Sequence, residues 1–129
     1  MFLTMKRLFG LFPKPAPLRD ISRVYDLKER LDWGEPALTI IDVRRREAFN
    51  ERHVMGAISI PLEELVGRAQ ESLELDRDLY VYADSDEQSA QAIETLKQAG
   101  FERVSLLRGG VAAWKAAGFP VEMTPPTAA

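Results

Sequence analysis

Three short runs of β-branched and aromatic residues, separated by helix-like patterns, place the strongest constraint on how this chain can fold. The runs are residues 38–43 (LTIIDV), 79–83 (LYVYA) and 104–107 (VSLL). Each is almost continuously apolar, which is typical of strands buried on both faces of a parallel sheet. Because helical patterns lie between them, they predict an α/β fold with a mainly parallel central sheet flanked by helices.

The helical patterns are marked by apolar spacing and by end signals. Val24, Leu27 and Leu31 share one face of a helix that would follow an N-cap at Ser22 and end before Gly34. Further helices are expected at residues 47–51, 62–68, 89–99 and 111–116.

The chain divides into a segment, a domain and a tail. Its 129 residues, 46% of them apolar, suit one domain with a single core. Residues 1–17 form an apolar segment followed by a proline-rich linker, PKPAP, that cannot continue a helix. We expect the domain at residues 18–122 and a flexible tail at residues 123–129.

Residues 1–12 (MFLTMKRLFGLF) are rich in Met, Leu and Phe but too short to span a bilayer, which needs about 20 apolar residues. The apolar block after Lys6 and Arg7 is also too short for a secretory signal, and no small-residue cleavage site follows it. Two alternatives stay open. The segment docks on the domain or on a partner, or it lies weakly at a membrane surface. Whether Met1 or Met5 starts the protein is also open.

Charge and cysteine content exclude several classes of function. The net charge is -3 and the basic residues are scattered, so we expect no nucleic-acid-binding surface. The chain has no cysteine and one histidine, His53, so it can form no disulfide, thiolate metal site or cysteine nucleophile. We expect no metal and no cofactor. The lack of cysteine suits either redox compartment; we expect a cytoplasmic location, with peripheral membrane attachment as the alternative.

Several short motifs occur in an order that resembles one known family. Residues 41–44 (IDVR) precede residues 52–57 (RHVMGA), the pair Gly109-Gly110, Trp114 and residues 118–121 (GFPV). Together they resemble the rhodanese family. The resemblance implies a single rhodanese-like α/β domain with its chemistry in a loop after the central strand. In the family that loop begins with a catalytic cysteine and leads into a helix N-terminus, which favours negative charge.

Most of the motif residues have structural explanations of their own. Asp42, at the end of a buried strand, can accept N–H groups of the following loop. His53 is interpreted as a hydrogen-bonding brace, since the chain has no nucleophile for it to activate. We assign structural roles to seven residues: Asp42, Arg44, His53, Gly56, Gly109, Gly110 and Trp114.

Alanine occupies the place of the family's catalytic cysteine. Aligning residues 81–82 and 89–90 with the family pattern puts Ala83 there, so no persulfide or phosphocysteine intermediate can form on it. The loop lacks the glycine and arginine that family members commonly have at this point. The vestigial active-site loop consists of Ala83, Asp84, Ser85, Asp86, Glu87, Gln88 and Ser89.

The three acids of this loop bring negative charge to the place where an anion would bind. Each carboxylate within about 4 Å of an anion costs on the order of 1–4 kcal/mol. Ser85-x-x-Gln88 fits a capping box, and acids in a first turn suit the helix dipole. We therefore expect the loop to cap a helix that starts near Ser89.

These observations favour a non-catalytic rhodanese-like module that binds a protein partner of unknown identity. One alternative is an enzyme of phosphate or ester chemistry that uses Asp84, or a divalent cation held by Asp84, Asp86 and Glu87. Another is a subunit that works with a cysteine-bearing sulfurtransferase.

Overall fold

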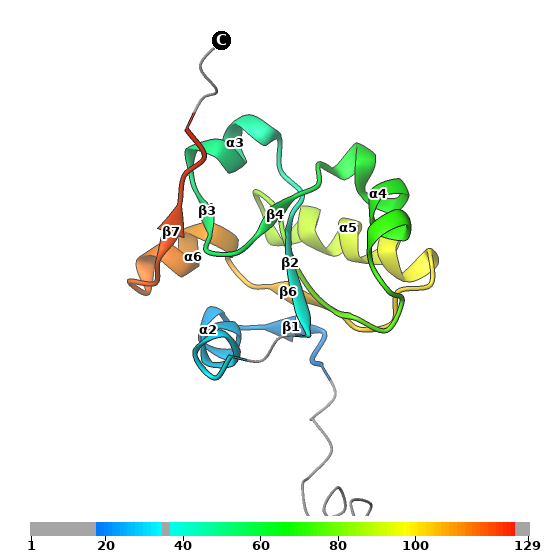
Figure 1. Cartoon of the computed structure of the whole chain (residues 1–129), viewed down its shortest axis with the longest axis horizontal. Helices are drawn as coiled ribbons and strands as arrows, with labels where there is room; N and C mark the ends of the chain where they lie inside the picture. The colour runs from blue at the N-terminus through cyan, green and yellow to red at the C-terminus, as the bar shows by residue number, and fades with distance from the viewer. Residues whose placement is uncertain (1–17, 35–36, 126–129) are drawn as a thin grey trace, which may run out of the picture.

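Five parallel strands form the central sheet of the structure, a computed structural model that describes residues 18–34 and 37–125 (Figure 1). The strands lie in the order β1-β6-β5-β2-β4. Their bounds are β1 Ile21–Ser22, β2 Leu38–Asp42, β4 Ile58–Ser59, β5 Asp78–Tyr82 and β6 Val104–Leu107. The expectations for residues 1–12, for the linker and for residues 126–129 fall outside the described residues.

Helices cover both faces of the sheet, which confirms the predicted α/β fold (Figure 1). The helices α2 and α6 pack on one face, and α4 and α5 pack on the other. None of the helices in the described ranges is long and apolar enough to cross a bilayer. The helical bounds are α2 Val24–Asp32, α3 Arg46–Glu51, the 3-10 turn η1 Leu62–Glu64, α4 Leu65–Ser72, α5 Asp86–Gln98 and α6 Gly110–Ala116.

The alternation of side chains along β2 and β5 creates two separate cores. The two strands pair from Leu38 opposite Asp78 to Asp42 opposite Tyr82. Ile41 belongs to the cluster under α4 and α5, whereas Ile40 belongs to the cluster under α2 and α6. Successive residues of a strand point to opposite faces, so a strand buried on both sides must be apolar throughout.

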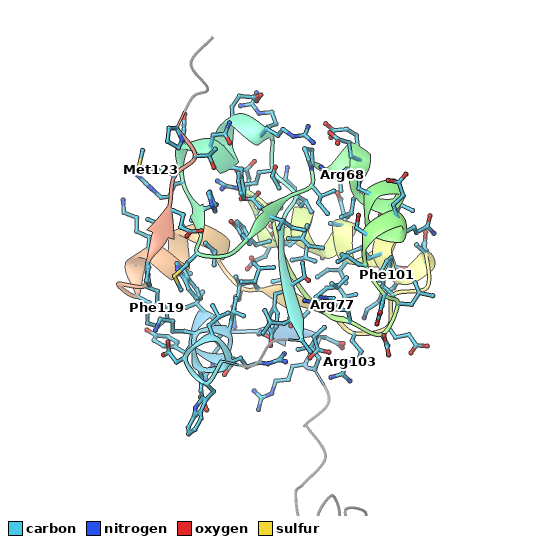
Figure 2. The ribbon with its side chains drawn as sticks, in the orientation of Figure 1. Arg68, Arg77, Phe101, Arg103, Phe119 and Met123 are labelled. Atoms are coloured by element: carbon cyan, nitrogen blue, oxygen red, sulfur yellow. The ribbon has the colours of Figure 1, made fainter. Side chains whose placement is uncertain are left out.

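Ion pairs hold the amino end of the sheet. Asp78, at the start of β5, lies between the guanidinium groups of Arg30 and Arg103. Figure 2 labels Arg103 among the side chains of the domain. Arg30 Nη1 lies 2.9 Å from Asp78 Oδ2. Burial opposes the charge of Asp78, but the hydrogen bonds of the two arginines outweigh it and lower the pKa of this carboxyl.

Two sequence predictions about helix ends were wrong. Ser22 lies in β1 and is buried against β6, so the N-cap of α2 is Arg23. Helix α5 begins at Asp86, three residues before the expected start, because Ser85 caps it.

The pattern also missed four strands of two residues each, β1, β4, β3 (His53–Val54) and β7 (Val121–Glu122). The last two pair with each other in an antiparallel ribbon. Strands this short are set by their pairing partners and leave no periodicity in the sequence.

A buried pair of hydroxyls between β1 and β6 provides a test of this packing. Ser22 Oγ and Ser105 Oγ lie 2.6 Å apart, and the residues are 3% and 0% exposed. We expect Ser105→Ala to lower the free energy of unfolding by about 1–3 kcal/mol, because it strands the Ser22 hydroxyl. Adding Ser22→Ala should cost less than the sum of the single changes. Urea denaturation measures this, with exposed Ser72→Ala as the control; additive losses would contradict it.

Candidate functional site

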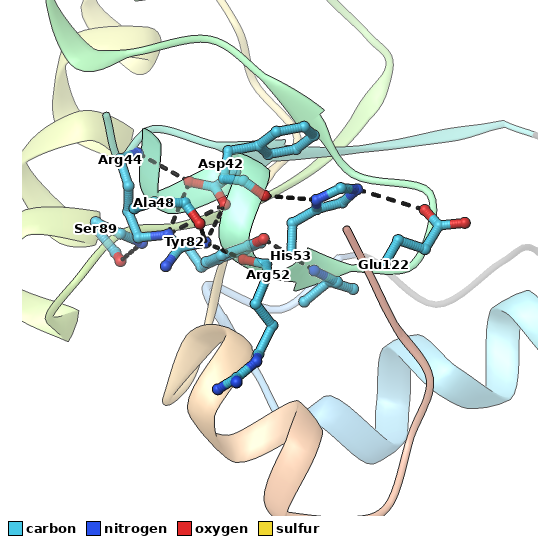
Figure 3. Close-up of polar contacts among 11 residues, drawn as sticks. Asp42, Arg44, Ala48, Arg52, His53, Tyr82, Ser89 and Glu122 are labelled. Carbon is cyan, nitrogen blue, oxygen red and sulfur yellow. Dashed lines mark hydrogen bonds and ion pairs between the residues drawn. The ribbon is translucent and has the colours of Figure 1, made fainter. Parts of the chain in front are cut away.

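The carboxyl ends of β2, β5 and β6 lie at one edge of the sheet, and Figure 3 shows the side chains of Asp42, Arg44 and Tyr82 close together there. Asp42 ends β2, Ala83 follows β5, and Gly109 follows β6. In open α/β sheets this is the edge at which ligands bind, because the strand-to-helix loops lie side by side there.

Asp42 and Arg44 form a buried ion pair at this edge. Their side chains are 0% and 9% exposed, and Arg44 Nη2 lies 2.7 Å from Asp42 Oδ2. Asp42 Oδ1 also accepts the backbone N–H of Arg44 at 2.9 Å. Burial of the guanidinium opposes its charge, but the hydrogen bonds and the negative charge of Asp42 outweigh burial and raise the pKa of Arg44. Arg44 therefore serves structure and is largely withdrawn from solvent.

The ion pair extends to neighbouring elements. Arg44 Nη2 donates to the carbonyl of Arg52 at 2.6 Å, at the end of α3. The Arg44 guanidinium also lies 5.5 Å from the ring centroid of Tyr82. The Tyr82 hydroxyl accepts the N–H of Val54 at 3.1 Å, and burial with the charge of Asp42 raises the pKa of the phenol. Tyr82 therefore remains neutral and links β5 to β3.

His53 is held by contacts that lead away from the loop. Its ring is stacked on Phe49, with centroids 3.7 Å apart, and Nδ1 lies 2.8 Å from the Phe49 carbonyl oxygen. A carbonyl only accepts, so Nδ1 carries a proton. Nε2 lies 3.5 Å from Glu122 Oε1 on β7. His53 thus joins α3 to the β3–β7 ribbon.

The glycines and Trp114 position α6 against the site. A Cβ on Gly110 would lie 3.1 Å from the Tyr82 ring and 3.3 Å from the Ala83 carbonyl oxygen, so glycine allows the close approach. Its neighbour Gly109 has φ +76°. Trp114 is fully buried and its indole N–H donates to the Pro120 carbonyl at 2.6 Å.

Gly56 belongs to the turn between β3 and β4. It has φ +84°, a conformation that favours glycine. Its N–H donates to Glu122 Oε1 at 2.9 Å, the same carboxylate oxygen that faces His53. This turn is therefore tied to β7.

Hydrogen bonds of two serine side chains, Ser85 and Ser89, hold the conformation of the loop after β5. The N–H of half-buried Ala83 donates to Ser89 Oγ at 2.8 Å, and Ser89 Oγ donates to the Ser85 carbonyl at 3.0 Å. Ser85 Oγ accepts the N–H of Gln88 at 3.2 Å, which is one of the two bonds of a capping box. None of these bonds uses the side chain of Ala83, so the loop is shaped independently of that position.

The three acids do not act together as the sequence suggested. Asp86 Oδ1 accepts the N–H of Gly109 at 3.0 Å and so bridges the loop to the turn before α6. Asp84 and Glu87 are exposed, and Asp84 contributes to the field that acts on Arg44. Ser85 caps α5, as its capping-box pattern predicted, and Asp86 and Glu87 lie in the first turn of the helix. Within residues 18–34 and 37–125, no three His, Asp or Glu side chains are grouped so that they could hold a metal ion.

Comparison with known protein families shows which family the chain belongs to. The family model described as "Rhodanese-like domain" matches residues 23–117, so the chain belongs to the rhodanese-like domain family. The resemblance inferred from the motifs is thereby confirmed.

Several known proteins are similar to this chain over most of its described domain. The solution structure of the rhodanese-like domain of Alr3790 from Anabaena sp. is 52% identical with a TM-score of 0.78, covering 87% of this chain and 88% of that chain. A protein named sulfurtransferase from Allochromatium vinosum is 34% identical over 95 residues, 74% of this chain and 87% of its own length. The chain spans only 46% of another relative, the HTH-type transcriptional regulator Rv0324 of Mycobacterium tuberculosis, which is 36% identical over 109 residues. It also spans 46% of YrkF from Bacillus subtilis.

Two residues of the site had no signal in the sequence. The sequence pattern predicts Tyr82 only as an apolar residue of a buried strand, yet its hydroxyl accepts the N–H of Val54 in β3. Glu122 lies at the end of the expected domain, yet its carboxylate reaches both Gly56 and His53. Their partners lie 28 or more positions away in the chain, so only tertiary structure brings them together.

The unequal contacts of the acids give a test. We expect Asp86→Ala to lower the free energy of unfolding by about 1–2 kcal/mol, since the Gly109 N–H loses a charged acceptor. The matched change Asp84→Ala should alter it by less than about 0.5 kcal/mol, as for other exposed side chains. Thermal and urea unfolding compare the two variants. Equal losses would show that the carboxylates act through the helix dipole alone.

Proposed function

We propose that this rhodanese-like domain is a non-catalytic binding module, with the vestigial loop at residues 83–89 as a contact surface for a protein partner. The observation that carries the proposal is Ala83 at the position where the family has its nucleophile. Sulfur transfer through a persulfide requires a thiolate, and the chain has no cysteine.

The state of the loop supports binding as its remaining role. Ser85 and Ser89 hold its backbone, so little conformational entropy is lost when a partner contacts it. Asp84 and Glu87 are exposed and form no ion pair with any residue in the described ranges. These free carboxylates suit a protein segment that carries lysine or arginine.

A second candidate is a subunit that works with a cysteine-bearing sulfurtransferase. The likeness to the protein named sulfurtransferase from Allochromatium vinosum favours it. In this role the partner would supply the thiol, and the present chain would supply only contacts. The carboxylate or metal enzyme is less well supported, because Asp86 is turned toward Gly109 and away from a shared site with Asp84.

The catalytic part of the proposal is tested with thiosulfate and mercaptopyruvate. We expect the purified chain to show no sulfurtransferase turnover and no persulfide mass shift, because it has no thiol. Ala83→Cys should restore at most trace activity, since the neighbouring carboxylates raise the pKa of the new thiol above its reference of about 8.5. Ala83→Ser is the matched control. Turnover by the unaltered chain would overturn the proposal.

The binding part is tested by reversing the free charges of the loop. Asp84→Lys with Glu87→Lys should abolish capture of the partner in a pull-down from native extract. Glu71→Lys with Glu74→Lys, the same charge change on exposed residues in the last turn of α4 and just after it, should leave capture unchanged. Equal capture by both variants would place the contact surface elsewhere.

A further inference from the structure

The outer face of α2 carries an unusual stripe of exposed side chains. Tyr25, Glu29, Asp32 and Trp33 are spaced so that they share one side of the helix, opposite the buried Val24 and Leu27. Tyr25 is 55% exposed and Trp33 is 78% exposed. The stripe thus has an aromatic ring at each end and two carboxylates between them.

The two carboxylates of the stripe are available to an added cation. Glu29 forms no ion pair with any residue in the described ranges. Among the residues that the structure describes, Asp32 pairs with Lys28, at 2.6 Å, and its side chain is 59% exposed. At the other end, the Tyr25 ring packs edge-on against Phe119, with 5.5 Å between the ring centroids.

The chain enters the domain beside this helix. Leu18 packs on the same apolar cluster as α2, and the charge of Arg19 is among the influences that lower the pKa of Asp26 in its first turn, after the hydrogen bond from Arg23. An extended linker of five residues, 13–17, reaches about 15 Å. The nine residues of α2 are about 14 Å long, so the linker alone extends over about the length of this helix.

Residues 1–12 have the complementary pattern. Lys6 and Arg7 lie in the middle of the segment, with Phe2 and Leu3 before them and Leu8 and Phe9 after them. We propose that residues 1–12 dock in cis along the outer face of α2. Lys6 and Arg7 face Glu29 and Asp32, and the apolar residues on either side cover Tyr25 and Trp33.

Attachment makes even a weak contact effective. A short linker holds its segment at an effective concentration of about 1 mM, so a contact with a dissociation constant of about 1 mM is half populated. The segment covers the domain surface and not its core, so its removal leaves the fold intact.

Trp33 is a built-in reporter, because the other tryptophan, Trp114, is fully buried. Acrylamide is uncharged, so charge reversals do not alter its local concentration. We expect its quenching constant to be about twofold lower for the full chain than for a chain lacking residues 1–12, as half occupancy implies. Trp33→Phe measures the contribution of Trp114.

Exchanging charges between residues 6–7 and α2 tests whether Lys6 and Arg7 face Glu29 and Asp32. Lys6→Glu with Arg7→Glu should raise quenching to the value of the truncated chain, and adding Glu29→Lys with Asp32→Lys should restore protection. Arg45→Glu with Arg52→Glu, the same charge change beside α3, is the control and should leave quenching unchanged. Far-UV circular dichroism checks folding of each variant; if the α2 variant does not fold, the truncation comparison alone decides.

Three outcomes would overturn docking in cis. Equal quenching of the full and truncated chains would show that the segment leaves the stripe uncovered. Protection that grows with protein concentration, with a doubled mass, would place the segment on a second copy. Absent protection together with binding of residues 1–12 to phosphatidylglycerol vesicles would make the segment a membrane contact.

Discussion

Asp42 is completely buried at the carboxyl end of β2, so its charge has to be compensated inside the protein. Arg44 provides this compensation through its side chain and its backbone N–H. The same guanidinium binds the carbonyl of Arg52, and burial together with the charge of Asp42 raises the pKa of Tyr82 and keeps the phenol neutral. Contacts around this buried carboxylate therefore join β2, β5, α3 and β3 at the site edge.

The loop after β5 lies next to the Asp42–Arg44 pair and keeps its conformation without a thiol. Its geometry rests on hydrogen bonds between backbone groups and the hydroxyls of Ser85 and Ser89: Ser89 Oγ bonds the Ala83 N–H and the Ser85 carbonyl, and Ser85 Oγ accepts the Gln88 N–H. The loop geometry of this site can therefore be held while the nucleophile is absent. Family membership defines the fold here, and the residues of the site define what the chain is able to do.

The capping pattern of α5 was readable from the sequence, but the long-range contact of Asp86 was not. The sequence pattern indicated a capped helix, and α5 is capped, by Ser85. Asp86 is diverted because the turn before α6 brings the Gly109 N–H within 3.0 Å of its carboxylate. Gly110 makes that approach possible, since any side chain there would crowd the Tyr82 ring and the Ala83 carbonyl.

The sequence by itself determined the class of fold, the family and the absence of a thiol. Apolar runs such as residues 38–43 and 79–83 are long enough to encode buried strands locally, and residue types need no structure to be read. Tertiary structure alone decided the short strands β1, β3, β4 and β7, the pairing of Ser22 with Ser105, and the reach of Glu122 to His53. These features depend on partners that are distant in the chain and become neighbours only when the sheet forms, so no local pattern encodes them.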